Sequence, residues 1–139
     1  MAMSTAGGDV LETIRHLVRD ALPGCLALYV FGSRAEETAG PESDLDLAVL
    51  VPGTLDPVLR WRLAGDLAGK AGCEVDLVDF RSASTVLQVR ILMTGRRLWA
   101  VEPAASLYEA FVLSEKTALD EARAGLLEDI RREGTIHGG

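Results

Sequence analysis

The residues best suited to chemistry lie in the segment Tyr29–Val51, where one apolar run ends at Gly32-Ser33 and a second begins with Asp44 and Asp46. If the second run is a strand, Asp44 and Asp46 point to the same face, because side chains alternate along a strand with a period of two. Two carboxylates held side by side repel each other unless a cation lies between them. The pattern therefore predicts a divalent-metal site.

The glycine and serine that precede this pair predict a phosphate site beside the metal. Gly32 lacks a Cβ, so the backbone can come close to a phosphate there. Ser33 offers a hydroxyl and a backbone N–H, and we expect it to start a helical turn, where anions are favoured. Each feature alone is common in turns and strand ends. Their combination, with ten residues between Ser33 and Asp44, favours a functional site.

A third carboxylate is expected from a neighbouring strand, and the segment 74–80 offers Asp76 and Asp79. Asp76 stands between Val75 and Leu77, which is the pattern of a carboxylate that projects from a buried strand. Asp79 comes at the end of the strand, where a role in a turn or a helix start is easier to accommodate. We therefore prefer Asp76 as the third carboxylate and keep Asp79 as the alternative.

The three carboxylates predict the chemistry of a two-metal phosphoryl-transfer site. Asp44 and Asp46 would bind metal, and Asp76 would complete the shell of a second ion and act as base toward an attacking hydroxyl. Metal ions in such sites neutralise phosphate oxygens and hold the attack in line. Asp44, Asp46 and Asp76 are therefore candidate catalytic residues as well as metal ligands.

The elements that must position these residues follow from apolar spacing and from breaker residues. They are expected in the order α-β-β-α-β-α-β-α, over residues 9–22, 26–31, 44–51, 54–72, 74–80, 82–95, 98–101 and 104–133. This order predicts an α/β (α+β) fold, in which a small mixed sheet is flanked by helices. The 139 residues are enough for one domain with a buried core.

The expected domain organisation is simple. Residues 1–8 are small and polar and should be disordered. A single domain is expected over residues 9–133, with its core in 9–103 and a long C-terminal helix in 104–133. Residues 134–139 are expected to form a loose tail.

The long final helix carries apolar residues at steps of about four. They are Leu107, Phe111, Ala118, Ala122, Leu126 and Ile130. We expect this stripe to pack in the core, with a partner interface as the alternative. Trp61, Trp99 and Tyr108 are likewise expected in core or rim packing.

Composition narrows the classes of function. No apolar run approaches the roughly 20 residues that span a bilayer, and the first residues lack the pattern of a secretory signal, so we expect a cytoplasmic protein. The net charge of −7 argues against broad nucleic-acid binding, which relies on a basic face. Cys25 and Cys73 show no CxxC spacing and are expected to be small buried apolar side chains.

The combined motif Gly32-Ser33, Asp44-x-Asp46 and Asp76 resembles the signature of the nucleotidyltransferase superfamily typified by DNA polymerase β. The short chain, the sequence VDLVDF and the helix that ends at Gly95 look like the minimal nucleotidyltransferase (MNT) group within it. The resemblance covers about residues 9–103, and the long final helix carries no motif.

The resemblance implies a polymerase β-like nucleotidyltransferase fold and the use of Mg²⁺, with two ions, and ATP to transfer AMP. Many members of the minimal group are antitoxins that silence a HEPN-domain ribonuclease toxin by attaching AMP to one of its tyrosines. The chain is accordingly expected to be a metal-dependent protein adenylyltransferase with a HEPN toxin as partner. Two alternatives stay open: an antitoxin that only binds and masks the toxin, and a nucleotidyltransferase that acts on small molecules such as aminoglycosides.

The residues after Gly32-Ser33 depart from the pattern of the group, which is often basic and then glycine. Here they read Arg34-Ala35-Glu36-Glu37. Arg34 keeps the basic character and is expected to contact phosphate with Gly32 and Ser33. The two glutamates are unfavourable near a triphosphate unless they face solvent or a basic partner.

Three more arginines follow the third acidic strand and are candidates for contact with the triphosphate or the partner: Arg90, Arg96 and Arg97. Arginines are mostly exposed in folded proteins, so each is equally compatible with an ordinary solvated side chain.

Overall fold

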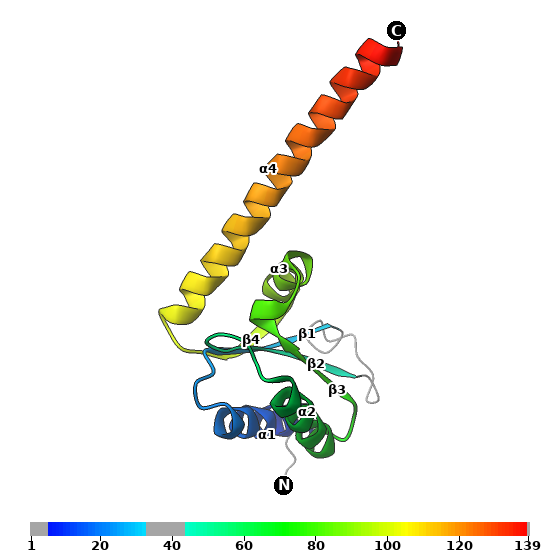
Figure 1. The fold of residues 1–139 in the computed structure, drawn as a ribbon. Coiled ribbons are helices and arrows are strands. Elements are labelled where there is room, and N and C mark those ends of the chain that lie inside the picture. Colours follow the sequence, from blue (N-terminus) through cyan, green and yellow to red (C-terminus); the bar gives the residue numbers. More distant parts are fainter. Residues whose placement is uncertain (1–5, 33–43, 139) are drawn as a thin grey trace.

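The computed structural model describes residues 6–32 and 44–138, which form four α-helices and a four-stranded sheet (Figure 1). In chain order the elements are α1 (Ala6–Ala21), β1 (Ala27–Phe31), β2 (Leu45–Leu50), α2 (Pro57–Ala71), β3 (Val75–Asp79), the short 3₁₀ helix η2 (Phe80–Ser82), α3 (Thr85–Thr94), β4 (Arg96–Ala100) and α4 (Ala104–Gly138). The expected order of helices and strands is confirmed, and so is the mixed sheet flanked by helices.

The sheet has the strand order β3-β2-β1-β4. β1 runs antiparallel to both β2 and β4, whereas β2 and β3 are parallel. In this register Phe31 lies opposite Asp46, and Asp46 lies opposite Asp76. The end of β1 and the starts of β2 and β3 therefore meet at the same end of the sheet.

Local capping signals set the two ends of α2, inside the range 54–72 expected for this helix. The carboxylate of Asp56 accepts a hydrogen bond of 2.9 Å from the backbone N–H of Leu59, and Pro57 opens the helix. Gly72 ends it in the left-handed conformation, with φ 72°. These signals fix the point at which β3 can begin, at Val75.

The position of α3 depends on a close approach between its C-terminal end and β1. Ser84 caps the start of α3 by accepting a hydrogen bond from the backbone N–H of Leu87. At the other end, a Cβ on Gly95 would lie 2.9 Å from the carbonyl oxygen of Val30. Glycine lets α3 pack this closely over the strand that leads to Gly32.

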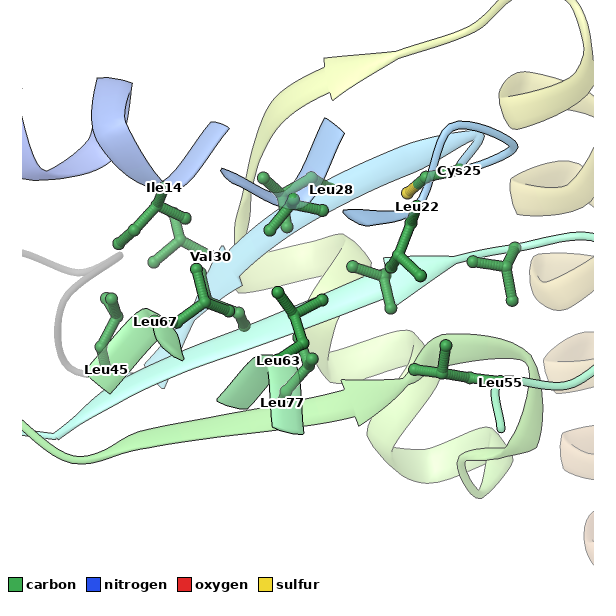
Figure 2. Packing of buried hydrophobic residues seen from close by; sticks show 14 residues of the cluster. Ile14, Leu22, Cys25, Leu28, Val30, Leu45, Leu55, Leu63, Leu67 and Leu77 are labelled. Atoms are coloured by element: carbon green, nitrogen blue, oxygen red, sulfur yellow. The ribbon is translucent and has the colours of Figure 1, made fainter. Parts of the chain in front are cut away.

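The sheet is covered on both faces, by α1 and α2 on one side and by α3 and α4 on the other (Figure 1). The core between the sheet and the first pair of helices contains Ile14, Val18, Leu28, Val30, Leu45, Leu47, Leu63, Leu67 and Leu77, among others (Figure 2). The core on the other face contains Tyr29, Phe31, Ala48, Leu50, Phe80, Ile91 and Val112, among others. Because β1 and β2 supply alternate residues to both cores, their sequences are almost continuously apolar.

The apolar stripe of α4 does not pack in the core, contrary to our expectation. Phe111 is 54% exposed and Leu126 is 59% exposed, whereas Ala105 and Val112 are buried. The period of a stripe predicts which residues share a face of a helix, but it does not reveal whether anything covers that face. Most of α4 extends away from the sheet (Figure 1).

The helix bounds differ from expectation at both ends of the chain. α1 begins at Ala6 rather than at Asp9, and α4 continues to Gly138, past the end expected at residue 133. A single glycine such as Gly134 costs a helix only about 1 kcal/mol, so it does not have to end one. No helix in the described part of the chain combines the length and the apolar character needed to cross a membrane.

Polar contacts fasten the start of α4 to the sheet. The hydroxyl of Tyr29 on β1 donates a hydrogen bond of 2.6 Å to Oε2 of Glu109. Arg97 on β4 donates from Nε to the same oxygen at 3.0 Å. One carboxylate of α4 is thereby bound to two strands, which fixes the direction in which this helix leaves the domain.

Candidate functional site

Asp46 and Asp76 are direct neighbours on the parallel strands β2 and β3. Residues paired in this way have backbones about 4.8 Å apart and side chains on the same face. Both alternate with residues of the α1/α2 core, so they lie on the face that α3 and α4 cover. Asp44 directly precedes β2 and is exposed. The structure therefore places Asp76 beside Asp46, with Asp44 close enough for its charge to act on Asp46.

The electrostatics of Asp46 are those of an acid crowded by like charges. Its pKa is raised above the usual range, first by partial burial and then by the charges of Asp76 and Asp44. The charge of Arg90 on α3 acts in the opposite direction and lowers this pKa. Ionisation of Asp46 is thus harder than that of an ordinary aspartate, and a bound cation would favour the ionised form.

Gly32 lies against Asp46 on the other side from Asp76. It directly follows Phe31, the partner of Asp46 on β1, and it adopts a φ of 75°, which favours glycine. A Cβ at this position would overlap Oδ2 of Asp46. The absence of a side chain therefore lets the backbone at the end of β1 come within contact of the carboxylate.

The donors at this end of the sheet suit Mg²⁺ carried by a nucleotide. Mg²⁺ prefers oxygen ligands and is usually held by one or two carboxylates, while substrate phosphates and water fill the other positions. Asp46 and Asp76 provide the adjacent carboxylates, and Asp44 is a third one nearby. Within residues 6–32 and 44–138, no three His, Cys, Asp or Glu side chains form a complete ion site by themselves. The residues present thus fit a metal shared between protein and phosphate.

Asp79, the alternative third carboxylate, holds a turn together. Its Oδ2 accepts hydrogen bonds from the backbone N–H of Leu55 and from the hydroxyl of Ser82, each at 2.9 Å. These contacts tie the loop after β2 to η2. The structure therefore places Asp79 in the turn role considered for it, and it places Asp76 beside Asp46.

The three candidate arginines fall into different environments. Arg97 forms ion pairs with Glu109 and Glu102, so it belongs to the contacts that hold the start of α4 against the sheet. Arg96 is exposed on β4. Arg90 is exposed on α3 and is close enough to Asp46 for its charge to lower the pKa of that carboxyl. The spacing of the sequence alone does not separate these arginines, because their positions depend on how α3 and β4 pack.

Part of the expected phosphate site lies outside the described residues. Ser33 and Arg34 belong to the segment 33–43, as do Glu36 and Glu37. Their expected roles therefore rest on the sequence.

Trp61 is 78% exposed, so the expectation that it packs in the core or its rim is wrong. With Glu74 and Val75 it lines a hollow of about 500 Å³ between α2 and β3. A second hollow, of about 370 Å³, extends from Asp76 past Arg60 and Leu87. These hollows are lined by residues from several separate segments, so no spacing in the sequence points to them.

Comparison with known proteins bears on this site. The chain matches the family described as polymerase beta, nucleotidyltransferase over residues 12–103. It is 39% identical over 117 residues to the protein adenylyltransferase MntA of Shewanella oneidensis, and the match covers 84% of each chain.

Solved structures agree with this match. A chain from the crystal structure of a toxin-antitoxin complex with AMP-PNP superposes with a TM-score of 0.76 at 38% identity, over 86% of this chain and 97% of the other. A second chain superposes with a TM-score of 0.73 at 35% identity, over 89% of this chain and 98% of the other. It comes from a tri-AMPylated Shewanella oneidensis HEPN toxin in complex with its MNT antitoxin.

Proposed function

Since the chain belongs to the polymerase beta nucleotidyltransferase family, we propose that it is a metal-dependent protein adenylyltransferase that acts as an antitoxin. It transfers AMP from ATP to a tyrosine hydroxyl of a cognate HEPN-domain ribonuclease toxin and thereby inactivates that toxin. Support comes from the similar MntA protein, a protein adenylyltransferase, and from the similar complex that contains a tri-AMPylated HEPN toxin. The similar complex with AMP-PNP supports ATP as the substrate.

The observation in this chain that carries the proposal is the pairing of Asp46 with Asp76 beside Gly32. Carboxylates placed next to a close backbone approach are the arrangement that phosphoryl transfer requires. The absence of a bulky acceptor domain within the described residues suits a protein acceptor, which brings its own tyrosine.

The reaction exchanges one phosphorus–oxygen bond for another. The tyrosine oxygen forms a bond to the α-phosphorus of ATP, and the bond from that phosphorus to the bridging oxygen of pyrophosphate breaks. The phenolic proton passes to the carboxylate of Asp76, and pyrophosphate leaves. Asp76 thus acts as the base.

The remaining residues hold the nucleotide. The backbone at Gly32 would contact the phosphate chain, and Arg90 is available from α3. Ser33 and Arg34 are assigned to the same phosphate site on the sequence alone. Two Mg²⁺ ions, held by Asp44, Asp46 and Asp76 together with phosphate oxygens, would supply neutralisation of the charge on the transferring group. We place this reaction in the cytoplasm, where ATP and a ribonuclease toxin would meet.

Transfer of label from ATP tests the proposal. Purified protein is incubated with its cognate HEPN protein, Mg²⁺ and ATP labelled at either the α- or the γ-phosphate. Label from the α-phosphate should appear on the HEPN protein, and label from the γ-phosphate should not. The Asp44→Asn/Asp46→Asn double variant should transfer neither. A stable complex that never acquires label would instead favour an antitoxin that acts by binding alone.

A further inference from the structure

The carboxylate pair has two different sides. β2 lies between β1 and β3, so Gly32 at the end of β1 stands on one side of Asp46 and Asp76 on β3 stands on the other. On the glycine side the backbone is in contact with the carboxylate of Asp46, and the proposed function places the phosphate chain there. The Asp76 side ends at β3, which is the edge strand of the sheet.

Phosphoryl transfer places the attacking and the leaving oxygens roughly in line, on opposite sides of the phosphorus. If the pyrophosphate group is held next to Gly32, the attacking hydroxyl must arrive from the side of Asp76. A protein acceptor would therefore have to lie along the outer edge of β3.

The surface at this edge is shaped to receive a side chain. The hollow of about 370 Å³ begins at Asp76 and is walled by Leu87 of α3 and by Ala83, with Arg60 of α2 at its rim. The planar guanidinium of Arg60 donates a hydrogen bond of 3.2 Å from Nη1 to the carbonyl oxygen of Leu77, on the free edge of β3. An apolar wall next to a carboxylate suits the ring and the hydroxyl of a tyrosine.

The same edge carries an exposed aromatic side chain. Trp61 follows Arg60 on α2 and lines the neighbouring hollow of about 500 Å³ with Val75 of β3. Arg60 and Asp76 line one hollow, and the residues next to them in sequence, Trp61 and Val75, line the other. The two hollows therefore lie along the same edge of the sheet. Tryptophan and arginine are the residues most often found to dominate the energetics of protein interfaces.

We propose that the acceptor protein docks along the free edge of β3, with its reactive tyrosine in the hollow beside Asp76 and with Trp61 as the anchor of the interface. This inference rests on the proposed transfer of AMP to a protein tyrosine, and it adds the route by which that tyrosine reaches the site. Asp76 then contacts the hydroxyl, whereas Trp61 acts only on binding of the acceptor.

Steady-state kinetics of AMP transfer to the purified HEPN protein test this docking site. The variants are Trp61→Ala and Ala83→Trp, which fills the hollow, and the matched control is Phe111→Ala on α4. Trp61 and Phe111 are both exposed aromatic residues, so their truncation should leave the fold intact. Thermal melting checks the fold of each variant, and a melting shift with Mg-ATP checks nucleotide binding.

The docking site predicts that Trp61→Ala raises KM for the HEPN protein by about thirtyfold or more, because loss of an interface anchor costs at least about 2 kcal/mol. KM for ATP and the melting shift with Mg-ATP should stay unchanged. Ala83→Trp should also reduce transfer, and Phe111→Ala should behave like wild type.

An active wild type with unchanged KM in both Trp61→Ala and Ala83→Trp would overturn the docking site without touching the proposed function. An effect of Phe111→Ala alone would place the interface on α4 instead. Failure of the wild type itself to transfer AMP would overturn the proposed function.

Discussion

Gly32 and Asp46 are in such close contact that a single methyl group on the glycine would overlap the Oδ2 atom of the carboxylate. The glycine ends β1, and the aspartate stands opposite Phe31 near the start of β2. The backbone proposed to bind phosphate and the side chain proposed to bind metal are therefore placed as one unit. This contact couples the position of the Asp46 carboxylate to the backbone conformation at Gly32.

Gly32→Ala should abolish most AMP transfer, because the new Cβ displaces either the carboxylate of Asp46 or the backbone proposed to hold phosphate. Gly53→Ala is the matched control, since Gly53 has the same φ of 75° and nothing within 4 Å of a Cβ. Both substitutions should lower the free energy of unfolding by about 1–2 kcal/mol through left-handed strain. Transfer assays and urea unfolding separate the two effects, and equal activity in the two variants would argue against the contact.

Asp46→Asn should stabilise the free protein while abolishing transfer. Because the folded state raises the pKa of Asp46, ionising this group is harder in the folded than in the unfolded protein. The unfolding free energy of wild type therefore falls as the pH rises through this raised pKa. The asparagine of the variant does not ionise, so its unfolding free energy does not fall for this reason. Below the ordinary carboxylate pKa of about 3.9 the two proteins should converge.

Thermal melting at several pH values, without metal or nucleotide, measures this difference. Saturating Mg-ATP should reverse the order, because ligand at about a hundred times its Kd adds about 2.7 kcal/mol to wild type. A variant that melts below wild type at neutral pH in the absence of ligand would contradict the account of Asp46. Transfer should fall by about a hundredfold or more, since the metal supplies several kcal/mol.

The sequence predicts most of this fold because its local signals agree with its packing. Asp56-Pro57 and Gly72 bound α2 inside the expected range 54–72, and the apolar runs of β1 and β2 match strands buried on both faces. Alternation along β3 also separates Asp76 from Asp79. These predictions depend only on the conformations and the periodicity of neighbouring residues.

The exposed stripe of α4 and the exposed Trp61 were beyond such reasoning. The sequence shows that a residue is apolar, but it does not show whether the surface that covers this residue belongs to the same chain or to a partner. The hollow at Asp76 was also unpredictable, because it forms only when α2, β3 and α3 come together.

Glu109→Ala should destabilise the domain without affecting catalysis, because it releases α4 from β1 and β4. It leaves the buried hydroxyl of Tyr29 and the side chain of Arg97 without their shared acceptor, at a cost of about 1–3 kcal/mol in urea unfolding. Burial raises the pKa of the Tyr29 hydroxyl, and the hydrogen bond to Glu109 and the charge of Glu109 raise it further, so this hydroxyl stays a neutral donor. Tyr29→Phe, which removes the donor, supplies the reference in the same urea unfolding series. A Glu109→Ala variant as stable as wild type would contradict this role of Glu109.

Intact-mass spectrometry of the cognate HEPN protein shows whether this protein attaches AMP to it. The HEPN protein is incubated with this protein, ATP and Mg²⁺, and the modified residue is located by peptide mapping. The account predicts a mass gain of one or more AMP units on tyrosine, absent with the Asp44→Asn/Asp46→Asn variant. A HEPN protein that stays unmodified while its activity is still suppressed would contradict the enzymatic account.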